Sequence, residues 1–308
     1  MALIDLDKML AKIKSSQWVL GDIDWDAAGA DMIPPEQWPK LKAFMSDLMW
    51  IEQVGARGFA ALAKKAPNDT LKEIYTYFHA EEQRHANAEM ALMKRWGMLE
   101  GDKTPEPNIN IRLVIEWLDK YGDDVPLIAL GSLIPMLEIA LDGALLKFLL
   151  DEVKDPVCHQ VFAKINDDES RHLGVDFHVL EMLGQGKKHR LMIEYLGTHL
   201  NPKIIIGALV YLPLLNRMRD NLIEMGLKEE RLYEAMNKYT RIGGRTEEGA
   251  RNPWFQVISR QGELMANRKN RFYHIPVDAL VTLSNYFPRR LLPPVPVWVE
   301  QLTWKPVA

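Results

Sequence analysis

A chain of 308 residues with 47% hydrophobic residues, 26% charged residues and a net charge of −4 has the composition of a globular protein, large enough for one sizeable domain or two small ones. Its single cysteine, Cys158, excludes both an intramolecular disulfide and a cysteine-based zinc site. No basic stretch is interleaved with aromatic residues, so nothing indicates a nucleic-acid partner.

The hydropathy pattern predicts neither a leader peptide nor a transmembrane segment. The first residues include acidic side chains and lack the apolar run of a signal peptide. The longest apolar stretch, 204–215, is far shorter than the roughly 20 residues that span a bilayer, and we interpret it as a buried helix. We therefore expect a cytoplasmic protein.

Apolar residues at helical spacing predict long helices after an N-terminal segment. The first covers 38–65 and stops before Pro67. Thr70 and Glu73 form a capping box that predicts the start of a second helix, which ends before Gly97. A polar connector and a shorter helix over 109–121 follow.

Two prolines predict the starts of the next two helices. The helix after Pro126, to about residue 153, is apolar nearly all round, and the helix that opens at Pro156 runs to Gly184. Three or four further helical patterns reach about Arg271 and precede a proline-rich tail. We predict an N-terminal segment (1–37), a four-helix bundle (38–184) and a C-terminal helical extension (185–308).

The second and fourth of these long helices carry the same pattern of an acid, a glutamate, any residue, an arginine and a histidine. It reads Glu81-Glu82-Gln83-Arg84-His85 in one helix and Asp168-Glu169-Ser170-Arg171-His172 in the other. Residues three apart share a helix face, so each Glu-x-x-His pair can grip one metal ion. The helices before them supply Glu52 and Glu138, each in apolar surroundings.

The spacing of these carboxylates indicates a duplicated helix pair. Glu52 and Glu82 are 30 residues apart, and Glu138 and Glu169 are 31 apart. An antiparallel helix hairpin of this length returns to its starting level, so all six candidate ligands can meet at one depth. A lone Glu-x-x-His is usually a salt-bridged surface pair. The joint pattern instead predicts a dimetal site, because unpaired buried carboxylates are costly.

The doubled motif resembles that of the oxygen-activating branch of the ferritin-like superfamily. This branch includes bacterial multicomponent monooxygenases, acyl carrier protein desaturases and ribonucleotide reductase small subunits. The resemblance covers about 38–184 and implies an all-α fold, a ferritin-like four-helix bundle with additional C-terminal helices. It also implies that Asp168 orients His85, that Glu81 orients His172, and that Arg84 and Arg171 brace these acids. A bound imidazole needs such an acceptor for its second nitrogen.

The sequence departs from particular members of this branch, and no single family is matched along the whole chain. Glu89 stands where the resembled reductase subunits carry a radical tyrosine. Gly55 and Leu133 exclude the Val-Tyr crosslink of the ligand-binding oxidases. Ile165 stands where arylamine N-oxygenases carry an additional histidine, which argues against N-oxygenation without excluding it.

Four carboxylates and two imidazoles favour two iron ions, with manganese or a mixed Mn/Fe pair as alternatives, over zinc. The six ligands would be the catalytic centre of a di-iron oxygenase or oxidase. With O2 and electrons from a reductase or ferredoxin, it would hydroxylate, desaturate, N-oxygenate or deformylate an apolar or amphipathic organic substrate. A manganese catalase and a non-catalytic iron-storage or ligand-binding protein are the alternatives. The sequence also allows a homodimer.

A substrate pocket beside the metals is predicted from small and apolar residues near the ligands. Pro135 should kink the third long helix next to Glu138 and widen the space there. The expected lining consists of Met49, Gly55, Phe59, Ile134 and Leu141. Residues of these types more often serve plain helix packing.

Overall fold

The computed structural model describes residues 4–101, 103–141, 149–150 and 153–293, and within these ranges the chain forms α-helices and short 3₁₀ turns but no strand. The bundle helices are α2 (Trp38–Lys65), α3 (Asp69–Arg95), α5 (Leu127–Leu141) and α7 (Pro156–Leu183). Around them lie α1 (Leu6–Ser15), η1 (Leu20–Asp22), α4 (Ile109–Tyr121) and η2 (Gly122–Asp124). The C-terminal part forms α8 (Lys188–His199), α9 (Pro202–Met225), α10 (Glu229–Gly243), α11 (Glu247–Arg251), α12 (Pro253–Ala266), α13 (Arg271–Asn285) and η4 (Arg289–Leu291).

Capping residues and a glycine mark the ends of several bundle helices. The predicted bounds of α2, α4 and α7 are confirmed, and the carboxylate of Asp155 caps α7 by accepting from the Val157 amide at 3.0 Å. Gly97, with a φ of +67°, follows the end of α3. The prediction of a capping box at Thr70 was wrong. Asn68 caps α3 instead, because its side chain accepts a hydrogen bond from the Leu71 amide at 2.8 Å.

One predicted helix lies partly outside the described residues, and the end of the helical part differs from the sequence prediction. The predicted third helix reached residue 153, but residues 142–148 and 151–152 lie outside the described ranges, so α5 is described only to Leu141. The helical part extends to Asn285 instead of ending near Arg271. Pro276 lies inside α13, and a proline within a helical pattern imitates a helix end.

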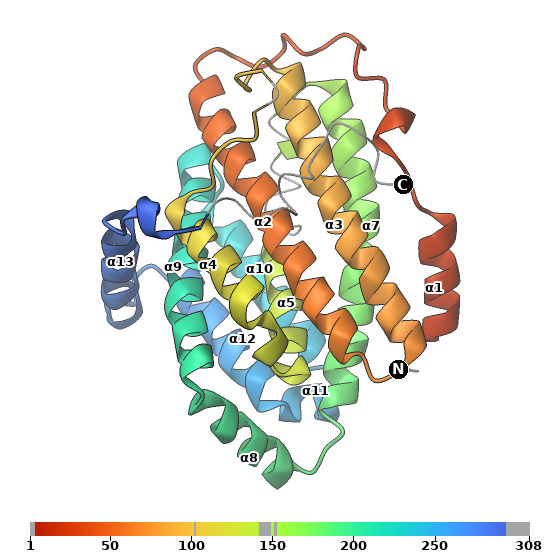
Figure 1. Cartoon of the computed structure of the whole chain (residues 1–308), viewed down its shortest axis with the longest axis vertical. Coiled ribbons are helices and arrows are strands. Elements are labelled where there is room, and N and C mark those ends of the chain that lie inside the picture. Colours follow the sequence, from red (N-terminus) through yellow and green to blue (C-terminus); the bar gives the residue numbers. More distant parts are fainter. Residues whose placement is uncertain (1–3, 102, 142–148, 151–152, 294–308) are drawn as a thin grey trace.

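The helices pack as two pairs with the C-terminal part against one side. Helix α2 lies against α3 and α5 against α7, and α2, α3 and α7 run along the long axis of the molecule (Figure 1). Helix α9 covers α4, while α10 and α12 cover α5. Helix α1 packs on α3 and α7. The all-α class is confirmed for the described residues, which form a four-helix bundle with additional C-terminal helices.

The apolar stretch 204–215 is buried over only part of its length. Leu214 and Leu215 are in the core, whereas Ile205, Ile206 and Leu209 are 49%, 45% and 50% exposed. The prediction of a buried helix was therefore wrong for the first half of α9. No single described helix is long and apolar enough to cross a membrane. The pair Arg190–His199 and Pro202–Met225, bent by 77°, meets the length and composition criteria jointly.

Candidate metal centre

The six residues predicted as metal ligands come together inside the bundle. All six are buried, and each bundle helix contributes one carboxylate. They form two overlapping groups whose ligand atoms lie within 4.8 Å of one another, Glu52, Glu82, His85 and Glu169 in one group and Glu82, Glu138, Glu169 and His172 in the other. Glu82 and Glu169 belong to both groups. Two ions held by these groups would share these carboxylates, and each ion would have one histidine.

Both imidazoles turn the same nitrogen towards the carboxylates. The Nδ1 atom of His172 lies 3.2 Å from Glu82 Oε1, 3.6 Å from Glu138 Oε2 and 3.1 Å from Glu169 Oε2. The Nδ1 atom of His85 lies 3.0 Å from Glu169 Oε1 and 3.5 Å from Glu52 Oε2. The two Nε2 atoms therefore remain available for outer hydrogen bonds.

Electrostatics and unmet hydrogen bonds indicate that a cation belongs here. Burial and the neighbouring Glu52 and Glu138 carboxylates raise the pKa of Glu82 well above its ordinary value. Despite the short distances, His85 Nδ1, Glu82 Oε1 and Glu138 Oε2 make no hydrogen bond of suitable geometry within the described residues. Atoms aimed at a common metal ion have this arrangement. Divalent cations would offset the repulsion, and an oxygen-rich set with two imidazoles fits iron or manganese.

The outer contacts of the histidines cross between the two motifs. His85 Nε2 lies 3.0 Å from Asp168 Oδ2, and His172 Nε2 lies 2.9 Å from Glu81 Oε2. Arg84 donates to Asp168 at 3.1 Å, and Arg171 donates to both acids. Each motif thus fixes the ring orientation of the other motif's imidazole.

Two residues of the N-terminal segment join this network and were missed by sequence reasoning. The Trp18 indole donates to Asp168 Oδ2 at 2.8 Å across 150 residues of sequence. Gln17 donates to Glu81 and accepts from Arg84 at 2.9 Å. No local spacing connects these residues to the motifs, so the sequence offered no signal for them.

Two further carboxyl groups are buried near the cluster. Glu89 and Asp176 each lie seven residues after a chelating glutamate, are fully buried, and have no hydrogen bond to either oxygen within the described structure. Burial first, and then the charge of Glu52 near Glu89 and Glu138 near Asp176, raises the pKa of each group well above its usual range. Each carboxyl group therefore holds its proton more strongly than a carboxyl group in water does. Because Glu89 follows Glu82 by seven residues, the same spacing after Glu169 is the sequence signal that identifies Asp176.

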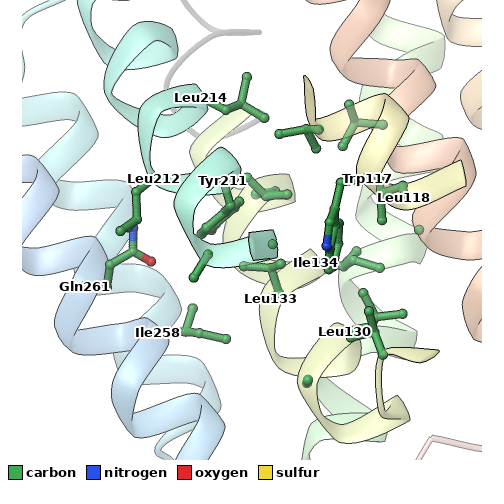
Figure 2. Close-up of a pocket in the computed structure, with 18 of the residues that line it drawn as sticks. Trp117, Leu118, Leu130, Leu133, Ile134, Tyr211, Leu212, Leu214, Ile258 and Gln261 are labelled. Carbon is green, nitrogen blue, oxygen red and sulfur yellow. The ribbon is translucent and has the colours of Figure 1, made fainter. Parts of the chain in front are cut away.

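A cavity of about 510 Å³ adjoins the cluster. Figure 2 shows Trp117 and Leu118 of α4 and Leu133 of α5 facing Tyr211 of α9 and Ile258 of α12. Nearly all of the lining is apolar, and Glu82 and Glu138 belong to the wall. The cavity therefore reaches from the C-terminal helices to the candidate ligands.

The predicted pocket residues only partly line this cavity. Gly55 and Ile134 do line it, whereas Met49 and Phe59 do not. Helix α2 turns positions 51, 54, 55 and 58 towards the cavity, so Met49 and Phe59 point to other sides. Phe59 instead packs against the His172 ring, with centroids 5.1 Å apart. The side chain of Leu141 lies outside the described part of the structure.

Gly55 leaves room for the ligand Glu82. A Cβ atom at Gly55 would overlap the Glu82 carboxylate. We expect Gly55→Ala to push this carboxylate aside and weaken metal binding about tenfold, at the low end for changes around a metal site. In the control Gly58→Ala, the added atom would lie 3.0 Å from the flexible end of Ile134. Competitive chelator titration compares the two variants, and equal affinities would contradict this role of Gly55.

Comparisons with known proteins give a similarity in structure but none in sequence. No protein-family model matches the sequence, and no curated protein sequence matches it. Among solved structures, the chain is similar to an R2-like ligand-binding oxidase with aerobically reconstituted metal cofactor after photoconversion. The two are 13% identical, with a TM-score of 0.49, over 86% of this chain and 94% of that chain.

Proposed function

We propose that this protein is a di-iron oxidase that uses O2 to oxidise an apolar organic molecule. One observation carries the proposal: a mainly apolar cavity of about 510 Å³ has Glu82 and Glu138, two members of the buried carboxylate and histidine cluster, in its wall. A substrate in this cavity lies beside the candidate metals and is shielded from water. A storage protein or a peroxide-dismuting enzyme has no use for such an apolar cavity.

The residues of the site fall into two groups, those that would bind the metal ions and those that orient the histidine ligands. Glu52, Glu82, His85, Glu138, Glu169 and His172 would hold two iron ions. Such a pair, when bound and reduced, supplies two electrons to O2. Asp168 and Glu81 accept hydrogen bonds from the Nε2–H groups of the two histidines and keep both Nδ1 atoms directed inward. A separate reductase or ferredoxin would provide the electrons for successive turnovers.

The cavity walls suggest the class of substrate. Two polar atoms on the lining residues, the Tyr211 hydroxyl and the Trp254 indole nitrogen, are buried and have no partner within the described residues. Both can donate a hydrogen bond. The cavity therefore suits a largely hydrocarbon molecule that carries one or two small polar groups, and it disfavours a charged metabolite.

Metal analysis and oxygen consumption test this function together. After anaerobic reconstitution we expect about two iron ions per chain, one for each Glu-x-x-His pair. Oxygen consumption should require a chemical reductant or an electron-transfer protein. An iron content near zero would refute the proposal. Rapid O2 release from peroxide without reductant would favour a manganese catalase, and far more than two irons per chain would favour storage.

A further inference from the structure

An exposed apolar face covers the bend between α8 and α9. We call it the elbow face, and it consists of Met192, Ile193, Leu196, Leu200, Ile205, Ile206 and Leu209. Their exposed fractions range from 39% at Met192 to 81% at Leu200. Large apolar side chains clustered in this way mark an interaction site more often than scattered ones do.

Helix α8 is apolar on two sides. Met192, Ile193, Leu196 and Leu200 share one side at spacings of three and four residues. Leu191 and the Thr198 side chain are buried on the opposite side, against the protein. Only the side with Leu191 and Thr198 packs against the rest of the protein. The outward side is therefore an additional apolar surface and not a displaced core face.

The charge around the elbow face is positive. Lys187, Lys188 and Arg190 at the start of α8 are exposed, and no ion pair joins them to another residue in the described ranges. Helix α8 carries one acidic residue, Glu194. An apolar stripe with neighbouring lysine and arginine is typical of helices that lie in the interface of an anionic membrane.

The cavity is continuous with the elbow face. Ile205 and Leu209 belong to the exposed face and also line the cavity. His199 and Ile204, at the bend, line it as well. The lining of the cavity therefore extends from this surface, past Tyr211 (Figure 2), to Glu82 and Glu138.

We propose that the elbow face docks on the surface of an anionic lipid membrane and that the apolar substrate enters the cavity from the bilayer. The second part rests on the proposed oxidase function, whereas docking requires no metal. The charges favour a membrane over a second copy of this chain. Residues 187–215 carry four lysine and arginine residues against one acid, Glu194, so a second copy of this face would offer these cations few anions, whereas an anionic membrane offers many.

Vesicle flotation tests the docking. Full-length protein should float with vesicles of phosphatidylcholine and phosphatidylglycerol and bind phosphatidylcholine alone more weakly, with added salt reducing the difference. Ile193→Ser combined with Leu196→Ser should lower binding by about tenfold or more, because two buried side chains are lost from the interface. The control combines Met32→Ser and Tyr233→Ser, whose native side chains are exposed by 52% and 49%, against 59% and 54% for the elbow pair. It should bind like the unaltered protein.

Three results would overturn the docking proposal. These are the absence of flotation, equal loss in the elbow and control variants, and a dimer that ignores vesicles and dissociates in the elbow variant. Iron content measured on the same samples separates the two proposals. Metal-free protein that still floats supports docking even if the oxidase function fails, and iron-loaded protein that never floats refutes docking alone.

Discussion

His85→Ala and His172→Ala should each abolish oxygen reduction and lower the iron content from about two ions per chain to one or fewer. Each histidine is the only nitrogen ligand in its group, and its Nδ1 atom faces the carboxylates. Loss of one ion leaves its share of buried carboxylates uncompensated, which also weakens the second position. Elemental analysis and single-turnover oxygen consumption measure both effects.

His159→Ala is the control for these two variants. His159 lies near the start of α7, and its ring contacts the Val153 carbonyl instead of a carboxylate. This variant should keep both ions and full oxygen consumption. If all three variants lose iron equally while circular dichroism shows intact helices, the assignment of His85 and His172 is incorrect. If all three variants lose helix content equally, the test is repeated with His85→Gln and His172→Gln, because glutamine preserves more of the side-chain volume.

The bundle and the meeting point of the six candidate ligands follow from local signals. A helix has a fixed rise, so carboxylates about 30 residues apart on a hairpin return to one level. The repeated motif places Glu82 beside His85 and Glu169 beside His172 without knowledge of the surroundings. The pairing of Asp168 with His85 of the other motif was predictable only from the family resemblance. The spacing of the residues does not indicate which motif's histidine an acid contacts.

The residues of the outer cavity wall could not be predicted from the sequence. Tyr211 and Ile258 belong to helices whose periodicity indicates an apolar side but not the partner of that side. The stretch 204–215 illustrates the same limit: its hydrophobicity suggested core, yet Ile205 and Leu209 face both the cavity and the exterior. Trp18 reaches Asp168 through a contact that chain folding alone creates.

Asp168→Asn should lower iron affinity or single-turnover oxygen consumption by about 10 to 100-fold, the usual effect of changes to groups that orient a metal ligand. The Asp168 carboxylate accepts from Arg84 and Trp18 and lies 3.0 Å from His85 Nε2. These partners, His85 foremost, outweigh burial and hold its pKa below the ordinary value. Asparagine keeps the size but removes the charge, so the imidazole becomes a weaker ligand and two buried guanidinium groups share only Glu81.

Asp167→Asn provides the matched control, since this neighbour is exposed and its side chain makes no hydrogen bond or ion pair with the cluster within the described residues. It should change the free energy of unfolding by no more than about 0.5 kcal/mol and leave iron affinity intact. Chelator titration and oxygen consumption compare both variants at a temperature where each is fully folded. If Asp168→Asn and Asp167→Asn bind iron equally well, the crossed acid does not tune the histidine. Because the contacts of Asp168 are with His85 and not with the candidate ions, such a result would leave the six-residue cluster standing.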